Sequence, residues 1–391
     1  MKTKKLYDEA PECFSFESEV VSCAPISPDT LSIELASTAF FPEAGGQSAD
    51  IGRLGDFEVV DVQIHEDDRI IHLCRFNDQD TLPVPGTLLQ GTIDHRRRLE
   101  LMRQHTGEHM FSGLVYRTYG GHNVGFHLSD HICTMDYDNP LSDAQVESIE
   151  TRVNELIQEN RPIHAYYPDE SDLEAMDYRC KGELKGPIRI VEIEGVDTCA
   201  CCAPHVLNTG EVGLLKVLEA KSYKGGVRLT IVCGMKAFAE LSRRARLLSE
   251  AAASLSSHFE DLPNRVQELK EERALLRGKN QQLQQQLLEA SIAQIPASSR
   301  HALFFVEEAD DKAVRETINH QMTLRDGCCG VFIGSDEAGY RFILGSAAID
   351  LQKTASILRE DYHAKCGGQK TMIQGQIPLS QRECEALFTS L

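Results

Sequence analysis

The stretch RRRLELMRQHTGEHMFSGLVYRTY, residues 96–119, decides the fold of this part of the chain. Its apolar residues recur at helical spacing, so it predicts a long α-helix. Within it, His105 and His109 are four residues apart, which places both imidazoles on one helix face, where they can chelate one ion. Glu108 directly precedes His109, whereas a helical zinc peptidase needs its glutamate immediately after the first histidine. The stretch therefore predicts a helix with two candidate metal ligands and disfavours a metallopeptidase.

A second candidate ligand pair lies near residue 200, in the segment Cys201-Cys-Ala-Pro-His205. This turn-like segment supplies a thiolate and an imidazole, which complete a four-ligand set suited to zinc together with the two helical histidines. The neighbouring Cys199 and Cys202 leave open which thiol faces the metal and whether a second ion binds. Core packing is the alternative for the thiols that bind no metal.

Outward from these motifs, the N-terminal part of the chain reads as β-structure. Residues 31–35 alternate between apolar and polar, and residues 59–64 are rich in β-branched side chains. Beyond the first long helix, residues 142–158 again have helical spacing, while 188–193 and 227–233 read as strands. The pattern predicts a small β-barrel-like domain followed by an α+β domain.

A heptad repeat marks the next region. Leucines recur every seven residues, and a second seam position alternates with them, as in a coiled coil. Self-pairing, an intramolecular hairpin with residues 241–255, and a solvated helical spacer are all compatible with this pattern. The seam residues are Leu262, Val266, Leu269, Arg273, Leu276, Asn280, Leu283 and Leu287.

The C-terminal part reads as a further α/β domain, with a strand at 302–306, a helix at 313–322 and a strand at 329–333. The predicted fold class is therefore α+β, with four regions. They are an N-terminal β domain over 1–90, a zinc-binding α+β domain over 91–235, a helical coiled-coil linker over 236–297 and a C-terminal α/β domain over 298–391.

Bulk properties narrow the class of protein. The 391 residues exceed what one core usually fills, and no apolar run approaches the ~20 residues that span a bilayer. The N-terminus lacks the apolar stretch of a secretory signal, so a cytoplasmic location is expected. Thirteen cysteines, an odd number, argue against a disulfide framework. A net charge of -20 means that any contact with nucleic acid must be local.

Together, the HxxxH and CxxxH motifs and the segment TAFFPEAGGQ, residues 38–47, resemble the editing domain of alanyl-tRNA synthetase and its freestanding relatives. Residues 94–98, 124–127, 209–213 and 224–228 also match that family. Residues 345–350 and 366–374 resemble, more loosely, the DHH-associated domain that ends the synthetase and its long freestanding relatives. No DHH phosphoesterase motif is present, so exonucleases that share this last domain are a poor match.

The resemblance implies a metal site and a substrate pocket. His105, His109, Cys201 and His205 would hold one zinc ion, and Thr38 and Gln47 would line the aminoacyl pocket. The Thr38 hydroxyl could pair with a serine hydroxyl, and Gly45 and Gly46 allow a tight turn or close backbone approach. Relatives usually have Gly-Gly-Thr where this chain has Cys202-Ala-Pro, a departure that concerns the loop geometry more than the ligand set.

The resemblance also implies a function. The expected activity is hydrolysis of the ester that joins serine or glycine to mischarged alanine tRNA, with zinc and without ATP. A noncatalytic tRNA-binding protein with a structural zinc is the main alternative, and another zinc hydrolase on the same scaffold is a third. Candidate tRNA contacts are Arg96, Arg97, Arg98, Arg103, Lys224, Arg228, Lys365 and Lys370, for which solvated, ion-paired surfaces are the common alternative. A homodimer through the heptad helix or the C-terminal domain is a further expectation.

Overall fold

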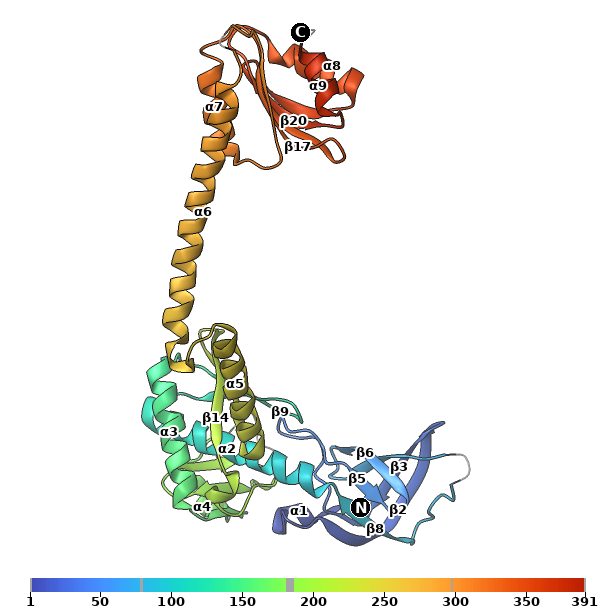
Figure 1. The fold of residues 1–391 in the computed structure, drawn as a ribbon. Coiled ribbons are helices and arrows are strands. Elements are labelled where there is room, and N and C mark those ends of the chain that lie inside the picture. The colour runs from blue at the N-terminus through green and yellow to red at the C-terminus, as the bar shows by residue number, and fades with distance from the viewer. Residues whose placement is uncertain (1, 78–79, 181–185, 297, 390–391) are drawn as a thin grey trace. The chain divides into compact units, whose positions relative to one another are not determined.

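The computed structural model describes residues 2–77, 80–180, 186–296 and 298–389. The chain divides into two compact units, Met1–Leu247 and Leu248–Leu391. It is a mixed α+β protein (Figure 1). Within the described residues, no helix has the length and apolar character needed to cross a membrane.

A closed six-stranded barrel opens the first unit. Alternating side chains fill its interior, among them Leu31, Ile33 and Phe57, which are buried. The barrel confirms the β-structure expected at the N-terminus. A short α1 (Leu6–Glu9) and a parallel pair, β1 (Lys4–Lys5) with β4 (Ser37–Thr38), lie outside it. In barrel order its strands are β2 (Ser15–Ser27), β3 (Thr30–Leu35), β7 (Ile70–Arg75), β6 (Phe57–Ile64), β5 (Gly52–Leu54) and β8 (Leu88–Ile93).

The predicted long helix is α2 (His95–Tyr119), and it positions the candidate site. Asp94 caps its start by accepting from the backbone N–H of Arg97, and Gly120 ends it in the left-handed conformation. Most side chains from Leu101 to Val115 are buried, because α2 packs against strands as well as against α3 (Asp143–Glu159). The side chain of Gln104 bonds both backbone groups of Cys233, which ties α2 to β15.

Two antiparallel sheets surround α2. One has the order β14 (Leu215–Tyr223), β15 (Gly226–Cys233), β10 (Cys133–Tyr137), β9 (Asn123–Leu128). The other has the order β11 (Ile163–Tyr166), β12 (Ile190–Ile193), β13 (Asp197–Ala200). Short helices α4 (Glu170–Ala175) and η1 (Thr209–Val212) lie between strands, and α5 (Gly234–Ser254) follows β15. The segment after β13 carries the CxxxH motif beside α2.

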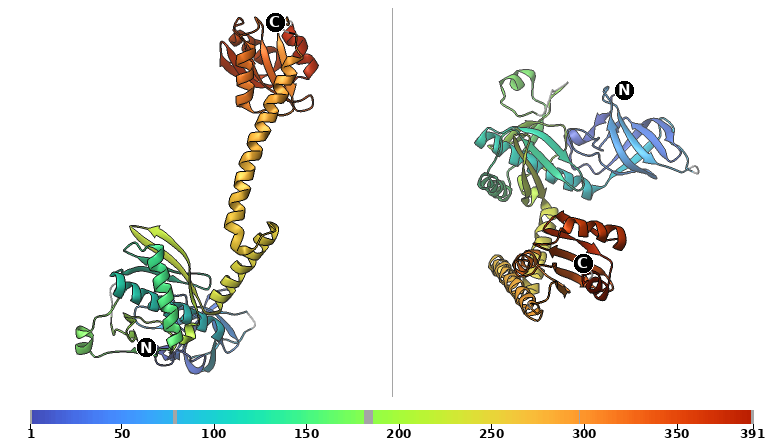
Figure 2. Two further views of the ribbon diagram at one scale, coloured as in Figure 1. Left: turned by 60° about the vertical axis from the view of Figure 1, so that its left-hand side comes forward. Right: turned by 90° about the horizontal axis from the view of Figure 1, so that it is seen from above.

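The second unit is built on a five-stranded sheet of order β16 (Ala302–Val306), β17 (Cys329–Ser335), β18 (Gly339–Gly345), β20 (Met372–Ile377), β19 (Lys365–Gln369). Only its β16–β17 pair is parallel. Neighbouring residues on β17 and β18 enter different cores, so the sheet is covered on both faces. Figure 2 shows this layered unit from two further sides. Its other elements are η2 (Phe259–Asp261), α6 (Leu262–Ala293), α7 (Asp311–Gln321), α8 (Leu351–Tyr362) and α9 (Gln381–Thr389).

The heptad helix α6 joins this unit through its last turns. Leu288 is buried and Ile292 packs beside it, in the core formed with β16 and α7. In contrast, the seam residues Leu276, Leu283 and Leu287 are 55%, 58% and 69% exposed. The helix was predicted from the heptads, while pairing of its seam stays a prediction.

Candidate metal centre

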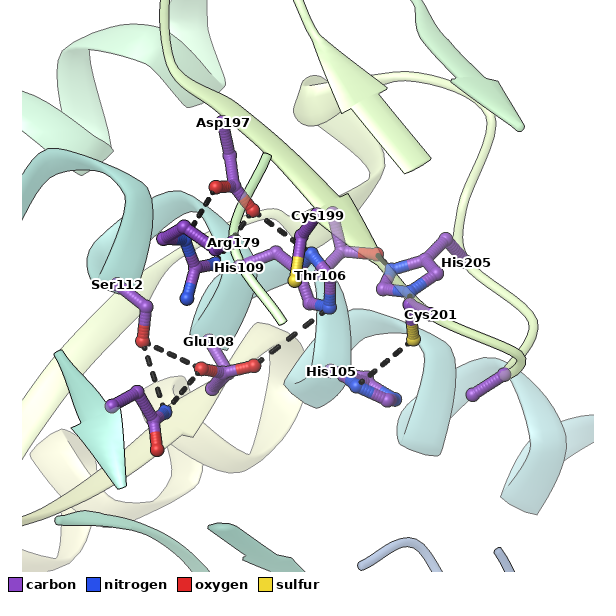
Figure 3. A network of polar contacts seen from close by, with 12 residues as sticks. His105, Thr106, Glu108, His109, Ser112, Arg179, Asp197, Cys199, Cys201 and His205 are labelled. Atoms are coloured by element: carbon purple, nitrogen blue, oxygen red, sulfur yellow. Dashed lines mark hydrogen bonds and ion pairs between the residues drawn. The ribbon is translucent and has the colours of Figure 1, made fainter. Parts of the chain in front are cut away.

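The structure brings the four predicted ligands together. His105 and His109 lie on successive turns of α2, and Cys201 and His205 lie on the loop after β13 (Figure 3). Their four ligand atoms are all within 4.8 Å of one another. The three imidazoles are buried and the thiol is half-buried. Two segments almost a hundred residues apart thus form one donor cluster.

The donor spacing fits a tetrahedral zinc ion. Cys201 Sγ lies 3.7 Å from His105 Nε2 and 3.4 Å from His205 Nε2. Zinc bonds of about 2.3 Å to sulfur and about 2.0–2.1 Å to nitrogen place such atoms roughly 3.5 Å apart at tetrahedral angles. Burial would raise the pKa of the Cys201 thiol, but the nearby His105 and His205 bring this pKa well below its ordinary value. A thiolate is the form that binds metal.

Each histidine has its other ring nitrogen occupied by a different partner. The Nδ1 atom of His105 lies 2.7 Å from Gln47 Oε1, and that of His205 lies 3.1 Å from Thr106 Oγ1. The Nδ1 atom of His109 lies 3.0 Å from an Asp197 carboxylate oxygen, at ion-pair distance but without hydrogen-bond geometry. Partners at Nδ1 fix the ring orientation and direct Nε2 to a metal. All three Nε2 atoms are therefore the natural donors.

Charge around His109 is balanced by a buried ion pair. The carboxylate of Asp197 receives two 2.7 Å hydrogen bonds from Arg179, one from Nε and one from a terminal nitrogen. Burial would raise the pKa of Asp197, but Arg179 and His109 lower it. Burial lowers the pKa of His109, and Asp197 and Cys201 outweigh this effect, so the pKa is raised to about 9. Burial lowers the pKa of His205 to about 3, which keeps that ring neutral as a ligand requires.

A second group of potential donors, His109, Asp197 and Cys199, shares one histidine with the first. Its carboxylate is already engaged by the guanidinium of Arg179. The first group is therefore the better metal site. Among the three neighbouring thiols, Cys201 is the one grouped with all three imidazoles, whereas Cys199 is grouped with His109 alone, so Cys201 is the better candidate ligand.

A buried polar network continues from the site along α2. One carboxylate oxygen of Glu108 accepts from Ser112 Oγ at 2.5 Å and from Asn123 Nδ2 at 2.6 Å (Figure 3). The other oxygen lies 3.9 Å from His109 Nε2. Ser112 also bonds the hydroxyl of Tyr137 at 2.8 Å. The i, i+4 spacing of Glu108 and Ser112 was a signal for this contact, whereas no sequence signal pointed to Asp197 and Arg179.

The predicted pocket residues Thr38 and Gln47 are both fully buried. The Thr38 hydroxyl lies 2.8 Å from His72 Nε2 and accepts from the backbone N–H of Phe40. His72 Nδ1 lies 3.0 Å from the Ile33 carbonyl and so carries the proton, which makes Thr38 the donor to Nε2. The Thr38 hydroxyl thus retains one free lone pair. Gly45 and Gly46 have positive φ angles of 58° and 82°, as the expected tight turn requires.

The basic residues predicted to contact tRNA lie in different environments, and Arg98 is not at the surface. Its guanidinium is fully buried, pairs with Asp50, and donates to the backbone carbonyl groups of Pro11 and Ala39. It links α2 to the barrel and leaves no surface for tRNA, so the prediction of a tRNA contact at Arg98 was wrong.

The remaining basic candidates keep some exposure. Arg96, Lys224, Lys365 and Lys370 are exposed, and Lys370 Nζ also lies 3.8 Å from a carboxylate oxygen of Asp350. The others are partly buried and engaged. Arg97 pairs with Asp130 at 2.6 Å, Arg103 with Glu100 at 3.2 Å, and Arg228 with Asp136 at 2.5 Å.

Part of the chain is similar to a domain found in aminoacyl-tRNA synthetases. The family described as the threonyl and alanyl tRNA synthetase second additional domain matches residues 188–230. This segment includes Cys201 and His205. The chain is thus similar, at the loop that carries these two candidate ligands, to a domain of aminoacyl-tRNA synthetases.

Relatives that match longer stretches of the chain are alanine–tRNA ligases and an alanyl-tRNA editing protein. The chain is 27% identical over 399 residues to the alanyl-tRNA editing protein Aarsd1-B of Xenopus laevis, covering 96% of this chain and 95% of the relative. It is 34% identical over 283 residues to the alanine–tRNA ligase of Ignicoccus hospitalis, covering 69% of this chain. A 27% identity to the Methanopyrus kandleri ligase covers 85% of this chain. The chain spans only 30% and 39% of the two ligases. The resemblance to freestanding alanyl-tRNA editing proteins is confirmed.

Proposed function

We propose that this chain is a trans-editing hydrolase that removes serine or glycine from mischarged alanine tRNA. The observation that carries the proposal is the buried donor group of His105, His109, Cys201 and His205, together with a freestanding editing relative that matches almost the whole chain. The four residues would hold one zinc ion. Zinc bound there would supply a Lewis acid for the ester carbonyl or lower the pKa of water toward ~7.

The chain's own residues prepare this site in three ways. The Nδ1 partners hold the three imidazoles in fixed orientations. Arg179 and Asp197 balance charge beside His109, and burial of the donors limits access of bulk water. Together the four residues would fill a tetrahedral zinc site, so another group of the chain would have to manage the water unless one of the four residues released the metal.

Selection against alanine would come from the pocket. A site that binds alanine cannot strongly exclude the smaller glycine, so a second hydrolytic site improves accuracy. The free lone pair of the Thr38 hydroxyl can accept a hydrogen bond from a serine hydroxyl, which alanine lacks. Thr38 and the Gly45-Gly46-Gln47 turn are therefore the proposed aminoacyl-binding residues.

For tRNA binding, we propose the exposed Arg96 and Lys224 in the first unit and Lys365 and Lys370 in the second. Arg97, Arg103 and Arg228 can contribute only by sharing or exchanging their present ion-pair partners. The remaining parts of the proposal are a cytoplasmic location and a homodimer through the exposed seam of α6 or the C-terminal domain.

A noncatalytic tRNA-binding protein is the second candidate function, because four-ligand coordination is typical of structural zinc. The deciding measurement is deacylation of seryl-, glycyl- and alanyl-charged alanine tRNA by the purified chain, with and without a chelator. We expect metal-dependent loss of serine or glycine while alanine is retained. His109→Ala should abolish the reaction, whereas His164→Ala, at an exposed position on β11, should not.

Absence of deacylation from all three substrates, in protein that still contains zinc, would move the function to the noncatalytic alternative. Deacylation of other aminoacyl-tRNAs at similar rates would instead indicate another zinc hydrolase on this scaffold. A broader substrate panel therefore belongs to the same experiment.

A further inference from the structure

Gln47 has an unusual combination of contacts. Its Oε1 atom lies 2.7 Å from Nδ1 of His105, while its Nε2 atom is buried without a hydrogen-bond partner. Within the described residues, three other buried side-chain atoms lack such a partner: two are acceptor oxygens of Glu100 and Asn139, and the third, His109 Nδ1, faces Asp197. Of these four atoms, Gln47 Nε2 is the only amide nitrogen. An amide NH2 group donates hydrogen bonds and accepts none, so Gln47 has a buried donor without an acceptor.

The loop that carries Gln47 is held tightly in place. The backbone of Gly46 accepts from Leu128 N–H at 2.7 Å, and that of Ser48 donates to the Leu128 carbonyl at 3.0 Å. A Cβ atom at Gly46 would approach the Phe126 carbonyl oxygen to 2.5 Å. The turn thus packs directly against β9 and delivers Gln47 to His105. A buried, unpaired amide in such a fixed loop is not explained by packing alone.

The metal site determines which way the amide faces. If Nε2 of His105 binds zinc, its Nδ1 must carry the proton and donate. Gln47 then has to present its oxygen to His105, as observed, and its NH2 group has to face elsewhere. The unpaired donor is therefore a consequence of the ligand arrangement. An oxygen of a bound substrate can satisfy it, which makes binding more favourable than in the free chain.

We propose that Gln47 has two roles: its carbonyl oxygen positions His105 as a zinc ligand, and its amide N–H2 donates a hydrogen bond to the carbonyl oxygen of the aminoacyl ester. The first role concerns the chain and the metal alone. The second rests on the proposed deacylase function. It makes Gln47 an electrostatic stabiliser of the developing oxyanion, in addition to a residue that lines the pocket.

Two substitutions separate the roles. Gln47→Glu keeps an acceptor for His105 but removes the donor, and Gln47→Met removes both groups at similar size. Gln90→Met, at an exposed position on the barrel, is the matched control. Zinc affinity is measured by competition with a chromophoric chelator, and the cobalt-substituted proteins are compared by visible absorption. Deacylation of seryl-charged alanine tRNA gives kcat and KM. Melting of the zinc-free proteins verifies folding, and Gln47→Ala replaces any variant that fails to fold.

We expect Gln47→Met to weaken zinc binding about 10- to 100-fold and to change the cobalt spectrum. Gln47→Glu should retain zinc affinity at or above the wild-type value while kcat falls about 10²- to 10³-fold, with a smaller effect on KM. Unchanged zinc affinity in Gln47→Met would overturn the positioning role. Wild-type kcat in Gln47→Glu would overturn the donor role. If the unmodified chain deacylates nothing, the donor role fails with the proposed function, while zinc affinity still decides the positioning role.

Discussion

His72 is a fully buried histidine in the barrel, bonded to Thr38 and to the Ile33 carbonyl. Burial lowers its pKa to about 4 from 6.5. Between these pH values only the unfolded chain binds the proton, so the free energy of unfolding increases with pH there. We expect about 3 kcal/mol of stability to be lost as the pH falls from 6.5 through about 4. Urea unfolding across this range should show a weaker pH dependence for His72→Gln than for the wild type. Equal slopes in both proteins would contradict the assignment.

Thr38 bonds His72 and is also a proposed contact for the serine of the substrate, so its substitution should affect both stability and substrate selectivity. Thr38→Val leaves His72 Nε2 without its donor, so we expect a destabilisation of about 1–3 kcal/mol. If the remaining lone pair of the Thr38 hydroxyl recognises serine, the seryl-to-alanyl deacylation ratio should fall about fivefold, equivalent to about 1 kcal/mol. Thr30→Val, on the neighbouring strand β3, is the control. An unchanged ratio, measured where both proteins are folded, would remove Thr38 from substrate recognition.

At the scale of elements, α2 depends on glycines for its close packing. A Cβ atom at Gly107 would lie 2.4 Å from Cys233 Sγ, whereas one at Gly278 on α6 would meet nothing within 4 Å. We therefore expect Gly107→Ala to destabilise the first unit by about 1–3 kcal/mol through overpacking. Gly278→Ala should stabilise its helix by about 0.5–1 kcal/mol. Thermal unfolding of both variants tests the contrast. A stable Gly107→Ala protein would show that β15 can move away from α2.

Helices and strands with regular apolar spacing were predictable from the sequence, whereas contacts between distant segments were not. The helix over 96–119 and two of the barrel strands, at 31–35 and 59–64, followed from sequence pattern, because apolar spacing reports which face is buried. Arg98 was misassigned with its charged neighbours, although it precedes His105 by seven residues and so shares its buried face. The pairing of Asp197 with Arg179 could not be predicted, because it depends on how β13 and the segment before β12 meet in space. Motif spacing predicted the four candidate ligands that the structure brings together, but not the residues beside them.

At the scale of the whole molecule, the four candidate ligands all belong to the first compact unit. Metal that binds only the folded state stabilises that state by RT ln(1 + c/Kd), where c is the free metal concentration. We therefore expect two thermal transitions, of which a chelator lowers one and leaves the other unchanged. Calorimetry with and without EDTA, followed by zinc addition, checks this. His109→Ala should abolish the response to EDTA. A chelator effect on both transitions would mean that the units are coupled or that metal binds elsewhere.

The exposed seam of α6 predicts that two copies of the chain associate. Its C-terminal turns bury Leu288 against the second unit, yet Leu276, Leu283 and Leu287 remain exposed on heptad positions. Leucines repeated at this spacing are stabilised when a second helix covers them. We expect sedimentation equilibrium to show a monomer–dimer equilibrium that Leu283→Glu shifts to monomer. Leu275→Glu changes an equally exposed leucine outside the seam and should not alter it. A wild-type chain that stays monomeric at all concentrations would exclude self-pairing of the α6 seam.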